Sequence, residues 1–253
     1  MKRIILVVLS ISLLLCGCGA GNNNATEEPP KDLGIYSDIV SEFRELVEYR
    51  LSPDFEEKWI SDGFPDSIGF SEDMLKEGEH TNGYSNMIVE MLGYPWATSI
   101  SDYGYKLFDL NGDGIDELFF VRKDVGVEDD DSVRDEDFIL AILTVSDGKV
   151  KLIDAFWSRY KAAIIEGSKI YTMGSGGIAY LYNGIATIKD GKYSYEFSFG
   201  IDGFDKEKNT PLYYKGNNGT PEWITEEEFG KIAEQYPFEY GAEWKSVPLT
   251  LFK

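Results

Sequence analysis

The chain has 253 residues, of which 43% are hydrophobic, and a formal net charge of -21 at pH 7. So acidic a surface repels nucleic acid and anionic lipid, which argues against binding to either, and it attracts divalent cations. A chain of this length buries a full hydrophobic core without disulfides, and both cysteines, Cys16 and Cys18, lie near its beginning.

The first residues have the pattern of a bacterial lipoprotein signal. Lys2 and Arg3 precede the apolar stretch 4–15, which has the length of a signal-peptide core and is too short to span a bilayer. The sequence Leu-Cys-Gly-Cys that follows resembles a lipobox, so we expect cleavage after residue 17 and lipidation of Cys18. Cleavage before Cys16, or an ordinary cleaved secretory signal, is the alternative.

Residues 19–30 are small and polar and end in two prolines, as in a flexible tether. We therefore expect a signal peptide over residues 1–17, a flexible tether over 18–34 and a single calcium-binding α+β domain over 35–253. The protein is expected to be a monomer that its lipid anchor holds at the extracytoplasmic face of the cell membrane.

Helical patterns occupy the beginning of the expected domain. Apolar residues recur at helical spacing between residues 36 and 51 and predict an amphipathic helix there. Ser71, followed by two acidic residues, predicts the N-cap of a short helix, and residues 84–92 predict another.

The segment 109–117, DLNGDGIDE, carries the clearest chemical pattern in the chain. It places oxygen-bearing side chains at alternate positions around a glycine-rich turn, and several hard oxygen ligands on a flexible loop suit Ca2+ better than Mg2+. A solvated turn rich in Asp, Asn and Gly, without metal, is the alternative. The predicted ligands are the side chains of Asp109, Asn111, Asp113 and Glu117 and the main-chain carbonyl of Ile115.

The loop begins like an EF-hand but ends differently. An EF-hand has a bidentate Glu at its twelfth position, which here is Phe120, inside the apolar run 118–121. Residues 103–107 alternate with a period of two and predict a strand before the loop. We therefore expect Ca2+ to join two strands, with Glu117 at the ninth position as the closing acid.

Residues 108–121, FDLNGDGIDELFFV, resemble the calcium hairpin loops of FG-GAP and integrin-type propeller blades. They are even more similar to the single D-x-N-G-D-G-x-x-E-L loop of many secreted lipoproteins of clostridia and their relatives. In those proteins a helical stretch precedes the loop and an antiparallel meander follows it. The resemblance implies Ca2+ binding and export, and it implies no reaction. This chain has the loop once, so a complete propeller is not expected.

Turn dipeptides divide the rest of the chain into strands. The dipeptides Asp147-Gly148, Asn183-Gly184 and Asp190-Gly191 each separate two apolar runs and predict hairpins. The run 138–145 is almost continuously apolar, which is typical of a strand buried on both faces. The aromatic residues of 193–199 alternate strictly along one strand.

The end of the chain again predicts a helix. A capping box that starts at Thr225 predicts a helix over 226–236, and residues 247–252 predict a last strand. The expected fold class is thus α+β, with N-terminal helices, a large antiparallel β-meander of about seven to nine strands, a C-terminal helix and a final strand.

No catalytic motif stands out. His80 is the only histidine and has no partner pattern, and the glycine-rich stretch 174–177 lacks G-x-S-x-G spacing, so we expect a mobile turn there. A glycosidase pair of carboxylates leaves no sequence pattern among 45 acidic residues. The acidic run 128–131, continued at 135–137, is the place to look for one, although a solvated loop between two strands is the main interpretation.

Aromatic side chains are candidates for stacking on sugars, with core or cross-strand packing as the alternative. The candidates are Trp96, Trp157, Trp223, Trp244, Tyr193 and Tyr195. From the sequence we expect a calcium-stabilised, membrane-anchored extracytoplasmic lipoprotein, a non-catalytic binding or adhesion-type module with an extracellular protein or carbohydrate ligand. The alternative is a cell-surface polysaccharide hydrolase that uses a carboxylate pair.

Overall fold

The computed structural model of the protein describes residues 32–55, 57, 87, 99–127, 133–177, 179–217 and 220–253. The chain divides into two units, Met1–Pro30 and Lys31–Lys253, and every described residue belongs to the second. The predicted helix at Ser71 lies outside these residues, and of the predicted helix over 84–92 only Met87 is described; it is helical and buried. In the part of the chain that the structure describes, no helix has the length and apolar character needed to cross a bilayer.

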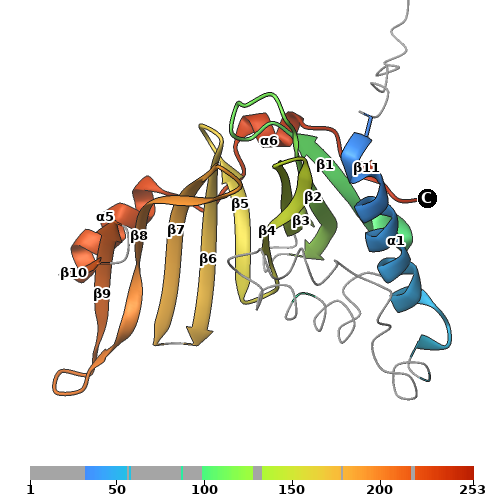
Figure 1. The fold of residues 1–253 in the computed structure, drawn as a ribbon. Coiled ribbons are helices and arrows are strands. Elements are labelled where there is room, and N and C mark those ends of the chain that lie inside the picture. The colour runs from blue at the N-terminus through green and yellow to red at the C-terminus, as the bar shows by residue number, and fades with distance from the viewer. Residues whose placement is uncertain are drawn as a thin grey trace, which may run out of the picture. The chain divides into compact units, whose positions relative to one another are not determined.

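A five-stranded antiparallel sheet is built around the hairpin that carries the acidic loop (Figure 1). Its strand order is β11-β1-β2-β3-β4, and a short 3-10 turn, η2 (Ile100–Asp102), leads into it. The predicted last strand is confirmed at the edge beside β1, although it is shorter than expected. The strands are β1 (Tyr103–Phe108), β2 (Glu117–Val127), β3 (Val133–Ser146), β4 (Lys149–Ala155) and β11 (Thr250–Leu251).

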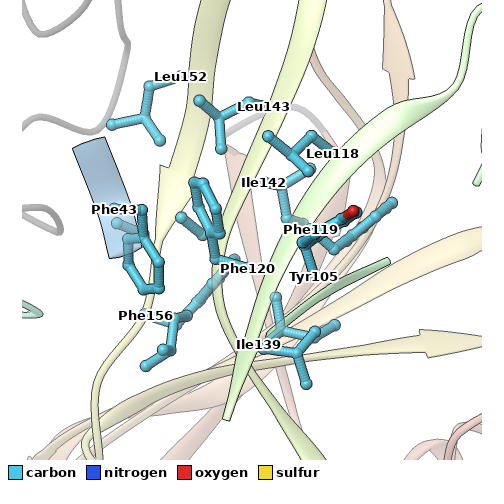
Figure 2. Close-up of a cluster of buried hydrophobic side chains, with 14 of the residues drawn as sticks. Phe43, Tyr105, Leu118, Phe119, Phe120, Ile139, Ile142, Leu143, Leu152 and Phe156 are labelled. Carbon is cyan, nitrogen blue, oxygen red and sulfur yellow. The ribbon is translucent and has the colours of Figure 1, made fainter. Parts of the chain in front are cut away.

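Helices cover both faces of this sheet. Neighbouring residues of a strand point to opposite sides, so adjacent side chains can pack on different helices. On one face, helix α1 (Ser37–Leu51), which follows the 3-10 turn η1 (Gly34–Tyr36), packs Phe43 on Phe120 with ring centroids 3.9 Å apart (Figure 2). On the other face, Trp244 of helix α6 (Ala242–Ser246) packs against Phe119, with ring centroids 4.9 Å apart. Residues 138–144 of β3 are all buried. The predicted N-terminal helix and the strand buried on both faces are therefore confirmed.

A second antiparallel sheet of six strands follows, in the order β10-β9-β8-β7-β6-β5. Helix α5 (Glu226–Gln235) covers one of its faces, and its Phe229 and its C-cap residue Tyr236 pack against Phe199. Its capping box is present: the Thr225 N–H donates to Glu228 and the Glu228 N–H donates to the Thr225 hydroxyl. The strands are β5 (Tyr160–Ile165), β6 (Lys169–Gly177), β7 (Tyr180–Lys189), β8 (Lys192–Asp205), β9 (Thr210–Asn217) and β10 (Thr220–Ile224).

The described strands thus form two sheets where the sequence predicts one large meander. The meander breaks after β4, where the Phe156 N–H returns to the Leu140 carbonyl and Trp157 forms an isolated bridge with Tyr160. Twisted open sheets rarely exceed about ten strands without splitting or curling. The described part is mostly β with helices before and after the strands, which agrees with the α+β class.

The hairpin predictions have mixed outcomes. Asp147-Gly148 and Asp190-Gly191 are turns, with φ between 53° and 72° at all four residues. The prediction of a turn at Asn183-Gly184 is wrong, because β7 runs through both residues. The buried Asn183 amide accepts a hydrogen bond from the Tyr171 hydroxyl and donates one to a carbonyl of β8, which holds it inside the sheet. The expected mobile turn at 174–177 is also wrong, because these residues end β6.

A register shift divides the alternating aromatic residues of β8 between the two faces of the sheet. Ile185 pairs with Phe197, whereas the next residue, Ala186, pairs with Tyr195. One extra residue in β8 therefore turns Tyr195 to the face opposite Phe197. Phe197 packs against Tyr236, the C-cap of α5, and Tyr195 contacts Tyr182 on the other face.

Candidate metal centre

The acidic loop closes the β1–β2 hairpin, as the sequence predicts. Phe108 pairs with Glu117, so residues 109–116 form the connection between the two strands. Gly112 and Gly114 have φ of 74° and 87°. A residue with a side chain adopts such left-handed angles only with strain, so both glycines are needed for the sharp path of the loop.

Side-chain oxygens turn inward and hold the loop from inside. Asp109 Oδ1 accepts hydrogen bonds from the N–H groups of Gly112 at 2.8 Å and Asp113 at 3.1 Å, and Oδ2 accepts one from Gly114 at 3.0 Å. Asn111 Oδ1 accepts from the Asp113 N–H at 2.9 Å, and Asp113 Oδ1 from the Ile115 N–H at 2.8 Å. An ionised carboxylate has about four acceptor positions, so both aspartates keep capacity for a cation.

Glu117 connects the loop to the core of the sheet. Its side chain is 0% exposed. Oε2 accepts from the Leu110 N–H at 2.8 Å, and Oε1 accepts from Asn111 Nδ2 at 3.0 Å and from the Thr144 hydroxyl of β3 at 3.1 Å. Burial raises the pKa of Glu117 to about 7, although the bonds from Leu110 and Thr144 act in the opposite direction.

The donor set fits Ca2+ by its chemistry, since carboxylate, amide and carbonyl oxygens are the ligands that this ion prefers. Among the described residues, however, no three acidic, histidine or cysteine side chains are close enough together to form a metal cluster. Asp109 and Asp113 lie in the loop, and Glu117 is hydrogen-bonded to the sheet. The five-ligand site, with Asn111 and Ile115 completing it, therefore stays a prediction.

Two further residues support the loop and are absent from the predicted site. Thr144 holds Glu117, and as a polar residue inside the apolar run of β3 it could have been noticed in the sequence. The buried Tyr36 hydroxyl donates to the Asp116 carbonyl oxygen at 2.9 Å and thereby ties the beginning of α1 to the loop. Burial, followed by the charges of Glu117 and Asp116, raises the pKa of Tyr36, so its hydroxyl stays a donor.

The acidic run behaves differently from the expected loop. Residues 128–131 lie outside the described part, as does His80, but residues 135–137 belong to β3 and are not a loop. Asp137 forms an ion pair of 2.6 Å with Lys106, which is only 3% exposed. This acid therefore has a structural partner in the core.

The aromatic candidates also separate. Trp96 lies outside the described residues, and Trp244 is a core residue. Trp157 packs on Tyr160 with ring centroids 5.2 Å apart, whereas Trp223 is 55% exposed. Of the tryptophans that the structure describes, Trp223 is therefore the one with a large surface open to a ligand.

The hairpin thus brings together an oxygen-rich loop, a buried acid beneath it and a tie to the first helix. Comparisons of the chain with protein-family models, with curated proteins and with solved structures found no match. Function is therefore inferred from the chemistry and geometry of the residues themselves.

Proposed function

We propose that this chain is a calcium-stabilised lipoprotein that its lipid anchor holds on the extracytoplasmic face of the cell membrane, where it binds an extracellular ligand. The observation that carries the proposal is the loop between β1 and β2, in which Asp109, Asn111 and Asp113 turn their oxygens inward above the buried Glu117. The signal-like beginning of the chain, ending at Cys18, supports the anchored location.

In this proposal Ca2+ is a structural ion. The loop concentrates negative charge in a chain whose net charge is already -21, and a bound divalent cation relieves that repulsion locally. The same loop meets β3 through Thr144 and α1 through Tyr36. Residues 35–253 then form one monomeric calcium-binding α+β domain, with N-terminal helices, a β-meander, a C-terminal helix and a final strand.

Calorimetric titration of Ca2+ and of Mg2+ into the full chain tests the proposal. We expect one saturable Ca2+ site per chain, with a Kd of about 0.1 to 1 mM as in other extracellular calcium modules, and weaker binding of Mg2+. The melting temperature should be higher in Ca2+ than in EDTA. Absence of saturable Ca2+ binding would reject the metal site.

Cell fractionation tests the anchor separately. The wild-type chain, expressed in a bacterium that processes lipoproteins, is expected in the membrane fraction, and the Cys18→Ala variant is expected to leave it. Cys16→Ala is the matched control and should remain with the membrane. A wild-type chain that is recovered without the membrane would reject the anchor and leave the calcium site unaffected.

The alternative, a polysaccharide hydrolase, is favoured by one observation. Burial raises the pKa of Asp154 to about 7, which is the range of a general acid. Asp154 is, however, 0% exposed, and its carboxylate accepts hydrogen bonds from the Tyr160 hydroxyl and the Ala155 N–H. Incubation with polysaccharides and measurement of new reducing ends distinguishes the two functions, since binding alone produces none.

A further inference from the structure

A row of aromatic and glycine residues crosses the six-stranded sheet on the face opposite α5. Residues paired directly across antiparallel strands lie on the same face. The strand neighbour of one row member, Tyr213, packs on Phe229 of α5, so the row itself points away from that helix. From β5 to β10 the paired residues are Tyr160, Gly174, Tyr182, Gly200, Tyr214 and Trp223.

The glycines leave room for tyrosine side chains close to the sheet. A Cβ atom on Gly200 would be 2.9 Å from Cε1 of Tyr214, and one on Gly184 would be 2.6 Å from the Tyr182 hydroxyl. Both distances are shorter than real contacts allow, and a Cβ on Gly200 would also collide with the Leu181 carbonyl oxygen. Backbone and tyrosine side chains together therefore occupy the space that a side chain would take. Glycine weakens a strand and often marks a close approach by a ligand or another group. Here the Tyr214 ring and the Tyr182 hydroxyl lie over glycine positions, and both tyrosines are partly exposed.

A groove lies over the part of this row that Gly174, Tyr182 and Tyr214 form. A second row, made of small residues, crosses the same face beside the aromatic one: Thr172, Gly184, Ser198, Gly216 and Pro221. Members of both rows, together with Tyr180 and Asp202, line a groove of about 370 Å³. This volume lies at the lower end of the range of about 300 to 1,000 Å³ for small-ligand sites.

The groove also has polar groups beside its aromatic faces. Burial, with Tyr195 as the next cause, raises the pKa of Tyr182, and burial followed by the charge of Asp202 raises the pKa of Tyr214. Both hydroxyls are therefore protonated at neutral pH and can donate as well as accept. Tyr180, which pairs with Asp202 at the end of the groove, is 54% exposed.

We propose that this groove binds a neutral glycan, with its pyranose rings laid across the strands. The apolar face of a pyranose stacks on an aromatic ring, and its hydroxyls bond to Asp202 and to the tyrosine hydroxyls. Tyr182 and Tyr214 belong to strands two positions apart, about 10 Å, which is a span that two linked pyranose rings cover. The inference deepens the proposed function, on which it rests, by naming the ligand class.

The charge and shape of the groove favour a neutral glycan over an anionic glycan or a small organic cation. Asp202 is the charged side chain among the residues that line the groove, and the chain as a whole is strongly acidic, so an anionic glycan is repelled. A small organic cation needs only one aromatic cage and a carboxylate. Such a cation uses only part of a groove that Tyr180 and Tyr182 of β7 and Tyr214 of β9 line.

Calorimetry with the full chain in Ca2+ tests the groove. The probes are hexasaccharides of β-1,4-glucan, β-1,4-xylan, β-1,4-mannan and chitin, with oligogalacturonate and tetramethylammonium chloride as the charged alternatives. We expect one or more neutral hexasaccharides to bind, and Tyr214→Ala to weaken that binding by at least about tenfold, as for removal of an aromatic anchor. Tyr213→Ala, on the opposite face of the same strand, is the control and should keep the affinity within about twofold.

Melting curves show whether each variant folds. If Tyr214→Ala does not, Tyr180→Ala replaces it, because this side chain lines the groove and is 54% exposed, so it is removed without loss of core packing. Equal binding by the groove variant and the control, no binding of any neutral hexasaccharide, or binding of only a charged probe overturns the proposal. Ca2+ stabilisation measured on the same preparation separates the failures: a Ca2+-dependent melting temperature without glycan binding rejects the groove and retains the calcium site.

Discussion

Replacing Asp109 by Ala removes the side chain that organises the loop. In the wild-type protein its two oxygens accept three backbone hydrogen bonds, at 2.8, 3.1 and 3.0 Å. Each is worth about 0.5 to 1.5 kcal/mol net, and water can reach the freed N–H groups, so without metal we expect a loss of about 2 kcal/mol. In a domain of this size that corresponds to a melting temperature about 4 to 8 °C lower.

Calcium should enlarge the difference in unfolding free energy between the wild type and Asp109→Ala. At a concentration of 100 times Kd, Ca2+ stabilises a folded protein by about 2.7 kcal/mol, and the variant cannot gain this energy if Asp109 is a ligand. The two proteins should then differ by about 5 kcal/mol, which is the sum of the hydrogen-bond and metal contributions. The increase on adding Ca2+ reports on the metal alone, since the hydrogen bonds are lost in both conditions.

Thermal unfolding followed by circular dichroism, in EDTA and in Ca2+ at 100 times the Kd found by calorimetry, measures both contributions. Asp116→Ala is the matched control: it removes a carboxylate from the same loop at a position out of register for the metal, and it keeps the carbonyl that accepts from Tyr36. The control should retain the Ca2+-dependent shift. If the Asp109 variant melts at the wild-type temperature in Ca2+, or if both variants lose the shift equally, the assignment of Asp109 as a ligand is wrong.

Two further predictions concern buried charges. Burial raises the pKa of Asp154 from 3.8 to about 7, so the folded protein binds the carboxyl proton more tightly than the unfolded chain does. This difference stabilises the folded state below about pH 4, and the stabilisation is lost as the pH rises through 7. Urea unfolding at pH 4 and pH 8 should show the stability of the wild type relative to Asp154→Asn falling by about 4 kcal/mol, and a constant difference would contradict this. Lys106→Ala leaves Asp137 without its ion-pair partner at 2.6 Å and should destabilise the protein by about 3 kcal/mol in urea. Lys231→Ala, which breaks an exposed ion pair with Glu227, should lower the free energy of unfolding by less than about 1 kcal/mol. If both variants lose the same unfolding free energy, the Lys106 pair stabilises the protein no more than an exposed pair does.

The conformation of the acidic loop was predictable because its interactions are local. Asp109 bonds to N–H groups three to five residues later, and Gly112 and Gly114 supply the left-handed angles within the same segment. Helix α1 and the Asp-Gly turns were predictable for the same reason, since capping, helical periodicity and positive φ depend on neighbours a few positions away. Residue order therefore contains most of the information for these elements.

The Asn183-Gly184 prediction shows where such local reasoning ends. The dipeptide favours a turn, but the Asn183 amide bonds to Tyr171 and to a carbonyl of β8, and Gly184 makes room for two tyrosine rings. Apart from Tyr182, which lies in β7 itself, these partners come from neighbouring strands. The energy of a satisfied buried amide and of packed rings outweighs a turn preference of two residues.

By itself, the sequence determined the oxygen-rich hairpin loop, the first and last long helices, two of the turns and the mainly β character of the chain. Only the tertiary structure decided that the strands form two sheets, that Thr144 and Tyr36 support the loop from 27 and 80 residues away, and that Tyr182 and Tyr214 lie in one row. A period of two shows which residues of a strand share a face. It does not show which strands become neighbours or where a bulge reverses the faces, because both depend on packing between distant segments.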